Sequence, residues 1–266
     1  MKNSTLLPPP PDILAALKAG TVNYEASQFD FRGVDLRGAN LSNTSLLGAH
    51  LKGAILSDAN LSGADLRGAN LHSVDLRSAN LHGASLNRAM LQKADLSGAN
   101  LTDARLQVAY YDSCTIWPSA YSYKNSGAIG PQAILNGAYL CTADLRDIDF
   151  QNTSLLGAYL NGADLTGANL QNARLSGATM RLAFLTGAYL RNARLNGVDL
   201  QGADLRAADL TNVEMENLQS IAGADFSLVQ GLSEANRAML LKRSNAELDV
   251  WNPYTRQTTR QSLGIT

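Results

Sequence analysis

Residues 59–78 read ANLSG ADLRG ANLHS VDLRS, four consecutive units of five residues with a leucine at the third place of each. The first place holds a small residue, and the second holds asparagine or aspartate. A large apolar residue recurs at the third place sixteen times in one frame, from Phe31 to Leu106, and seventeen times in a second frame, from Leu135 to Met215. Chance does not produce so many units in two unbroken frames, so this repeat decides the fold.

A period of five excludes the common regular structures. Amphipathic helices and coiled coils space their apolar residues at intervals of three and four, and a half-buried strand alternates with a period of two. Glycine often fills the last place of the unit, as at Gly63 and Gly68. Each such glycine would destabilise a long helix by about 1 kcal/mol. A short extended segment followed by a turn satisfies the pattern, with the leucine and the small residue pointing inward.

Units such as Ala59-Asn60-Leu61-Ser62-Gly63 resemble the A(D/N)LXX motif of the pentapeptide-repeat family, and the sequence is similar to that of cyanobacterial members. The resemblance covers residues 31–215. It implies an all-β solenoid, a right-handed quadrilateral parallel β-helix in which four units make one coil of twenty residues. Residue n then lies beneath residue n+20, and the repeats amount to about eight coils.

In such a solenoid the third-place side chains stack along the axis and form the core. We expect the core to include Phe31, Leu36, Leu56, Leu76, Leu96, Leu140, Phe150, Leu160 and Leu200.

The two frames define five segments of the chain. They are an N-terminal segment with a capping helix at 1–30, a first block of coils at 31–118, an inserted loop at 119–132, a second block at 133–230, and a C-terminal capping helix with a tail at 231–266.

The five-residue repeat changes its phase at the boundary between the two blocks. The step from Leu106 to Leu135 is not a multiple of five, but Tyr111 and Ile116 still keep the first phase. Cys114 is therefore expected at an inward first place. The loop that follows is either an insertion that the fold tolerates, with no role in binding, or an element that binds a partner.

Both ends of the solenoid need a cover, because open strand edges pair with other chains. Asp12 is expected to cap a short helix that ends at Gly20, and Ser233 to cap a helix over 234–243. These caps disfavour end-to-end polymerisation. Just before the second cap, Asp225 and Phe226 are expected to form one last unit outside the second frame.

The residues beyond the second cap form a tail with few apolar side chains, among them Trp251 and Tyr254. This tail is either mobile or docked on the coils through those two aromatic residues.

Composition limits the class of function. The net charge of −1 comes from 22 basic and 23 acidic residues. It provides no basic surface for general nucleic-acid binding and no strong negative field for imitating DNA. Residues 1–11 lack the apolar stretch of a secretory signal, and no apolar run reaches the length of a membrane span. The sequence predicts a cytoplasmic protein that does not bind membranes.

No motif predicts catalysis, a metal site or a cofactor. His50, His72 and His82 fall in different twenty-residue columns, so they do not converge on a metal. The repeated aspartates are expected to bind neighbouring backbone in turns. Cys114 and Cys141 point in different directions, which disfavours a disulfide.

The surface offers one candidate binding site. Tyr139 and Tyr159 are twenty residues apart and should stack on one face, with Arg181 and Leu182 beside them. Tyrosine and arginine are enriched at interface hot spots. The alternative is that the two tyrosines form an aromatic ladder that stabilises the coils and binds no partner.

We therefore expect a non-enzymatic scaffold, monomeric or dimeric, that binds an unidentified protein partner. One alternative is a DNA-mimicking modulator of a topoisomerase such as gyrase, an activity known in the family. The other is a passive structural protein.

Overall fold

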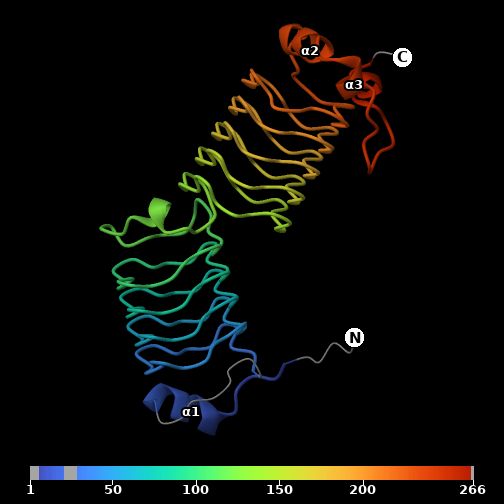
Figure 1. Ribbon diagram of the computed structural model, residues 1–266. Coiled ribbons are helices and arrows are strands. Elements are labelled where there is room, and N and C mark those ends of the chain that lie inside the picture. The colour runs from blue at the N-terminus through green and yellow to red at the C-terminus, as the bar shows by residue number, and fades with distance from the viewer. Residues whose placement is uncertain (1–5, 21–28, 265–266) are drawn as a thin grey trace. The chain divides into compact units, whose positions relative to one another are not determined.

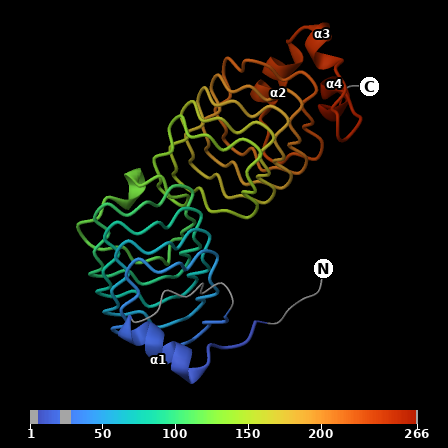
Figure 2. The ribbon, with the colours of Figure 1, turned by 60° about the horizontal axis from the view of Figure 1, so that its bottom comes forward.

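The computed structural model describes residues 6–20 and 29–264 and divides into two compact units, residues 1–129 and 130–266 (Figure 1). Within each unit the chain winds in stacked coils (Figure 2). Neighbouring coils are joined by single-residue parallel bridges between positions twenty apart, such as Asn40 with Asn60 and Asp75 with Asp95. The predicted twenty-residue register is therefore present in the described coils.

The backbone of each unit of five pairs both with the adjacent coils and with itself. The Leu61 amide donates to the carbonyl of Asn80 in the next coil (2.8 Å), and the Asn60 amide donates to that of Ala39 in the preceding coil (2.9 Å). The Ala64 amide closes the turn on the Leu61 carbonyl (3.0 Å). Since buried backbone groups must be bonded, this scheme is what makes a five-residue unit stable without longer strands.

The fifth place of the unit has a left-handed backbone, which explains its composition. Gly63 has a φ of 67°, and the fifth places that lack glycine also have positive φ, such as 54° at Asn43. Glycine adopts this conformation without strain, and asparagine tolerates it better than most residues.

The third-place side chains form the interior of both units. All nine residues expected in the core are at most 4% exposed. The first-place alanines beside them, such as Ala64 and Ala69, have no exposed surface. A larger first-place side chain would have to displace tightly packed neighbours.

The end of the first block differs from the prediction by one residue. Ile116 bridges to Asp95, a spacing of 21, and its side chain is exposed. Thr115 occupies the inward first place, where its hydroxyl donates to the Leu91 carbonyl (2.9 Å). The expectation that Cys114 and Ile116 point inward was wrong, because one extra residue after Tyr111 shifts the frame, and Cys114 is exposed.

The inserted loop is shorter than the expected 119–132. It contains the 3-10 helix η2, Tyr123–Asn125, and projects from the coils in Figure 1. The backbone returns to the coil at Gly127, whose carbonyl accepts from the Val108 amide (2.9 Å), and Gln132 pairs with Gln151. The difference arises because Gly130 takes a third place, where no apolar side chain signals the repeat.

The loop carries an aromatic cluster. The ring of Trp117 stacks on those of Tyr121 and Tyr123, with centroid distances of 5.8 and 5.3 Å. Tyr111, from the last regular unit of the first block, meets Trp117 edge-on at 5.4 Å. These contacts attach the loop to the end of the first block through aromatic packing.

The first coil is covered by α1, Pro11–Ala19, with Leu17 buried against the coils. The Lys18 carbonyl accepts from the Asn40 amide (3.2 Å), so the helix occupies part of the strand edge. Gly20 ends the helix with a φ of 67°, as predicted. Asp12 is not the N-cap: it lies in the first turn, because Pro11, with its preset φ, takes the first helical position.

The last coil is covered by three helices, α2 at Glu234–Leu241, α3 at Asn245–Leu248 and α4 at Thr259–Ser262. The Ser233 hydroxyl accepts from the Asn236 amide and caps α2 as predicted, although α2 ends at 241 instead of 243. The guanidinium of Arg243 donates to the carbonyls of Leu218 and Gln219. The cap thus satisfies backbone groups that the last coil leaves open.

The coil beneath this cap contains one extra residue. Asp225 bridges to Asp204 at a spacing of 21, and Phe226 is buried. The expected last unit outside the second frame is therefore part of the solenoid.

The tail is docked on the coils as a C-terminal hairpin, residues 250–258, in which Trp251 pairs with Thr258. Asn252 is buried, and its amide nitrogen donates to the carbonyls of Gly202, Ala203 and Gly223 at 3.3, 3.1 and 2.8 Å. The same side chain accepts from the amides of Tyr254 and Thr255 through its oxygen. Asn252 is therefore the main polar anchor of the hairpin.

We predict that Asn252→Asp detaches this hairpin, because a carboxylate would face three carbonyl oxygens without a donor. The expected loss of stability is about 1–3 kcal/mol, measured by urea unfolding, with faster tryptic cleavage after Arg256. Asn172→Asp is the matched control, since it keeps the oxygen that accepts from Asn192. Unchanged stability and cleavage in Asn252→Asp would contradict the anchoring role.

Outside the core, an aspartate at the second place binds an arginine two residues later wherever the sequence has one there. The Asp144 carboxylate accepts both the backbone amide (3.4 Å) and the Nε of Arg146 (2.8 Å). This arrangement lowers the pKa of Asp144 from its ordinary value to about 2, mainly through the side-chain bond to Arg146. The other pairs of this kind are Asp30–Arg32, Asp35–Arg37, Asp65–Arg67, Asp75–Arg77 and Asp204–Arg206.

Arg146→Gln is therefore expected to raise the pKa of Asp144 toward its ordinary value of about 3.9, measured by NMR titration of the carboxyl. Since the folded pKa lies below the unfolded one, the pair stabilises the fold at neutral pH. Its contribution is lost as pH falls from about 4 toward 2. Arg174→Gln, in another column, should leave the pKa of Asp144 unchanged; a similar shift in both variants would contradict the assignment.

Candidate partner surface

Within residues 6–20 and 29–264, no three His, Cys, Asp or Glu side chains are grouped so that they could hold a metal ion. No helix in these ranges is both long and apolar enough to cross a membrane. His72 bonds to the neighbouring Ser73 (2.8 Å), and His82 lies 3.8 Å from Asp103. The four candidate residues that the sequence indicated, Tyr139, Tyr159, Arg181 and Leu182, are all exposed on the outer surface of the coils.

Tyr139 and Tyr159 form the clearest surface feature of the second unit. Both occupy the second place of their repeat, where the backbone bridges directly to the next coil, so the register brings the rings together. Their centroids are 4.7 Å apart at an interplanar angle of 29°, a stacked pair. The exposed fraction is 79% for Tyr139 and 41% for Tyr159, so the pair presents one ring almost entirely to solvent.

Arg181 is held along the solenoid surface by three neighbours. Its backbone amide donates to the Asn161 side chain (3.0 Å), and its Nε lies 3.2 Å from the Asp199 carboxylate. Its Nη2 donates to the Gln201 side chain. The guanidinium is therefore oriented and largely neutralised before any partner arrives.

Leu182 is an apolar residue at a fifth place. It has a φ of 58° and is 44% exposed, although a left-handed backbone costs a bulky residue about 1–2 kcal/mol. Its side chain lies over Gly202: a methyl group there would approach Leu182 Cδ2 to 2.7 Å. The glycine thus leaves the space that Leu182 fills.

Arg181 and Leu182 line one shallow groove on the surface of the second unit, with a volume of about 480 Å³. The other lining residues are Thr142, Asn161, Gly162 and Gln201. Thr142 belongs to the same repeat as Tyr139, and Asn161 to the same repeat as Tyr159, so the two repeats that carry the tyrosine pair also line the groove. We call the surface formed by Tyr139, Tyr159 and this groove the Tyr–Leu face.

The structure adds a feature that sequence reasoning missed. The ring of Tyr254 in the C-terminal hairpin packs 4.6 Å from that of Phe184, and its hydroxyl lies 3.5 Å from the Leu182 carbonyl. The hairpin therefore borders the groove at Leu182, and Trp251 remains exposed. The aromatic residues of the tail signalled docking, but nothing in the repeat indicated where.

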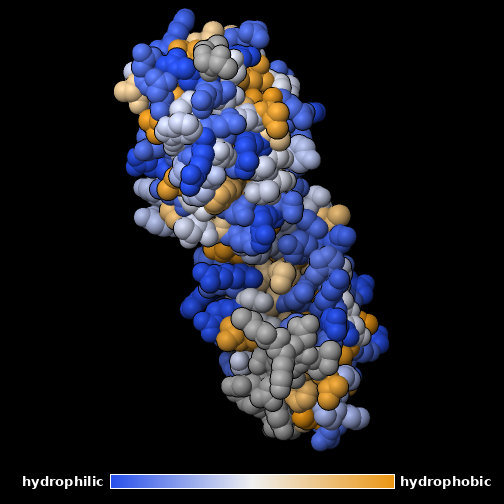
Figure 3. Space-filling model, turned by 90° about the vertical axis from the view of Figure 1, so that its right-hand side faces the viewer, coloured by the Kyte–Doolittle hydropathy of each residue, from blue (hydrophilic) through white to orange (hydrophobic). Residues whose placement is uncertain are grey.

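Apolar residues on the visible side of the molecule do not merge into one large patch. Figure 3 shows hydrophobic residues in small groups among hydrophilic ones. A partner on such a surface would depend on a few anchoring side chains more than on broad apolar contact.

The geometry defines a class of protein: a parallel β-helix built from five-residue repeats. A family model described as "Pentapeptide repeats" matches residues 30–68, 69–107, 143–181 and 183–217, more than half of the chain. The chain belongs to the pentapeptide-repeat family, whose fold is the right-handed quadrilateral β-helix.

Several solved structures are similar to this chain. HetL from Nostoc sp. strain PCC 7120, described as a pentapeptide repeat protein involved in heterocyst differentiation regulation, is 33% identical over 73% of this chain and 90% of its own, with a TM-score of 0.31. A pentapeptide repeat protein of the Arabidopsis thaliana thylakoid lumen is 33% identical over 48% of this chain and 86% of its own, with a TM-score of 0.45.

A third structure, Rfr23 from Cyanothece 51142, is 39% identical over 31% of this chain and 56% of its own, with a TM-score of 0.24. No curated protein matched the chain.

Proposed function

We propose that this protein is a non-enzymatic scaffold that binds a protein partner through the Tyr–Leu face. The observation that carries the proposal is the stacked pair of Tyr139 and Tyr159, which exposes most of one ring beside an open groove. Burying that ring under a partner would remove a large apolar area from water, and tyrosine is among the residues that dominate interface energetics.

Preorganisation supports the same face. Arg181 is already bonded to Asn161, Asp199 and Gln201, so a partner would not have to order a free arginine. The two tyrosine rings likewise support each other on rigid coils. Binding to such a face costs less conformational entropy than binding to a flexible loop.

The similarity to HetL, a protein described as involved in regulation, favours a regulatory role. The partner in this proposal is an unidentified protein, and the chain itself is a monomer or a dimer. General nucleic-acid binding and membrane binding are not part of the proposal, and the cytoplasm is the expected compartment.

We predict that Tyr139→Ala combined with Tyr159→Ala abolishes capture of the partner from native cytoplasm, measured by affinity pull-down and mass spectrometry. With the purified partner, the affinity should fall at least about thirtyfold, as for loss of a hot spot. Tyr189→Ala is the matched control, because Tyr189 is exposed on another column of the same unit.

Both variants should keep the melting temperature of the wild type to within a few degrees. A partner that the double variant still captures would exclude the Tyr–Leu face. Absence of any partner for the wild type would instead favour a passive structural role.

The alternative, a DNA-mimicking gyrase modulator, is opposed by charge. A mimic needs unpaired carboxylates in a row, whereas Asp65, Asp75 and Asp144 are each bonded to an arginine of their own repeat.

We therefore expect no change in DNA supercoiling by gyrase when the protein is added at micromolar concentration. The assay is read as the topoisomer distribution on a gel, with a known gyrase inhibitor as positive control. Inhibition or protection of gyrase by the wild type would favour the alternative over the scaffold.

A further inference from the structure

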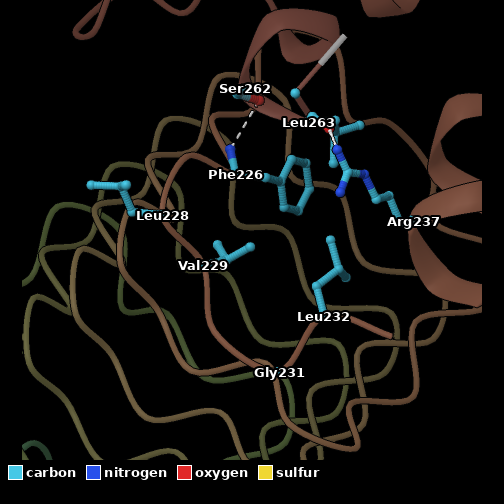
Figure 4. A pocket seen from close by; sticks show the side chains of 9 residues that line it. Phe226, Leu228, Val229, Gly231, Leu232, Arg237, Ser262 and Leu263 are labelled. Carbon is cyan, nitrogen blue, oxygen red and sulfur yellow. Dashed lines mark hydrogen bonds between the residues drawn. The ribbon is translucent and has the colours of Figure 1, made fainter. Parts of the chain in front are cut away.

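The groove of the Tyr–Leu face leaves an apolar side chain within reach of a partner. A hollow at the C-terminal cap, shown in Figure 4, also contains apolar residues, but its Phe226 and Leu263 are almost completely buried. In the groove, by contrast, the Leu182 side chain is 44% exposed. The groove therefore offers an apolar contact that the hollow at the cap does not.

The polar side chains in and beside the groove have already used their acceptor atoms. The Asn161 Oδ1 accepts from the Arg181 backbone amide (3.0 Å), and the Gln201 Oε1 accepts from Arg181 Nη2. One carboxylate oxygen of Asp199 accepts from the Gln201 amide (3.0 Å), and the other lies 3.2 Å from Arg181 Nε. Each side-chain oxygen of Asn161, Asp199 and Gln201 thus has a partner within the protein.

The remaining polar atoms of the same side chains are donors. Among the residues that the structure describes, Asn161 and Gln201 bond through their side-chain oxygens and not through their amide nitrogens, and Arg181 bonds through Nε and Nη2 and not through Nη1. Asp199 balances the charge of Arg181. The groove therefore presents several hydrogen-bond donors without a net charge from this pair.

The backbone of the groove cannot pair with a strand of the partner. Its amides at Thr142, Gly162 and Leu182 donate to the carbonyls of Asn161, Arg181 and Gln201 in the next coil, at 2.9, 2.8 and 2.8 Å. Because these groups are used within the solenoid, recognition in the groove depends on side chains and not on the addition of a β-strand.

We propose that the groove binds the C-terminal end of a helix in the protein partner, an inference that rests on the function proposed above. A helix ends in four carbonyl groups without partners inside the helix, and its dipole places a partial negative charge at the same end. These carbonyls would accept from Asn161, Arg181 and Gln201. An apolar residue in the last turn of the helix would pack against Leu182.

The spacing of the donors fits the width of a helix. Asn161, Arg181 and Gln201 follow one another at intervals of twenty residues. Since neighbouring coils are about 4.8 Å apart, the outer two donors are separated by about 10 Å. A helix with its side chains is about 10–12 Å in diameter. The guanidinium already has Asp199 as its counter-ion, which favours uncharged carbonyl groups over an acidic side chain.

Two isosteric variants test the donors. Gln201→Glu and Asn161→Asp each remove one amide donor and keep the oxygen that holds Arg181. Each should weaken binding of the partner captured by pull-down at least about tenfold, because a carbonyl of the helix would then face a carboxylate. The affinity is measured by calorimetry.

The control is Gln171→Glu, which adds the same charge on another column of the second unit and should leave the affinity unchanged. All three variants should keep the melting temperature of the wild type to within a few degrees, so that a weaker affinity reports on the groove and not on the fold.

A peptide probe tests the groove without the partner. The probe is an alanine-based peptide of about sixteen residues, stapled in its first turns because short helices are marginal in water. It has a leucine in its last turn and a C-terminal amide. We expect saturable NMR shifts of the side-chain amide signals of Asn161 and Gln201. A matched peptide, with its leucine in the first turn and its staple in the last, should bind at least about tenfold more weakly, because that end of a helix presents donors.

The two tests separate the helix end from the function on which it rests. If the double tyrosine variant loses the partner while Gln201→Glu and Asn161→Asp keep it, the Tyr–Leu face stands and the helix end is excluded. If the wild type captures no partner but binds the first peptide through Asn161 and Gln201, the helix end is supported and the scaffold function fails. Absence of binding by the first peptide, or tighter binding of the matched peptide, would overturn the proposal.

Discussion

The structure depends on one constraint: a backbone that turns every five residues must find hydrogen-bond partners in the coils above and below it. The Leu61 amide bonds forward to Asn80 and the Asn60 amide bonds back to Ala39, so a register of twenty residues follows directly. That register stacks third-place side chains such as Leu56 and Leu76 along the axis. Each buried leucine contributes about 1.5–3 kcal/mol, and the small first-place residues let the corners close around this stack.

The same register organises the outer surface, because like residues come to lie above one another. Asn40, Asn60, Asn80 and Asn100 form a ladder in which each side-chain amide donates to the preceding one, at 3.3, 3.2 and 3.1 Å. Aspartates such as Asp65 and Asp144 bond to an arginine within their own repeat. The stacked pair of Tyr139 and Tyr159 is one more product of this rule. The Tyr139–Tyr159 column carries aromatic rings where the asparagine column carries side-chain amides. This difference distinguishes the Tyr–Leu face from its surroundings.

The ends of the solenoid impose a second requirement, since a coil without a neighbour leaves backbone groups unpaired. At the C-terminal end, side chains meet this need: Arg243 and Asn252 bond directly to carbonyls of the coils. The cap that results is irregular, and irregular packing leaves concave spaces. The border of the groove at Leu182 lies where the cap meets the coils.

The sequence by itself determined the repeat, the register, the core and the stacking of Tyr139 on Tyr159, because each follows from a period of five and a coil of twenty. It also indicated caps at both ends, through Gly20 and Ser233. Only the tertiary structure decided the rest. One extra residue after Tyr111 turned Ile116 outward. Gly130 occupies a third place without an apolar side chain, so the sequence did not show that the coil resumes before residue 133. The placement of Tyr254 on Phe184 and of Arg237 beside Leu263 depends on contacts between segments far apart in sequence, which leave no periodic signal along the chain.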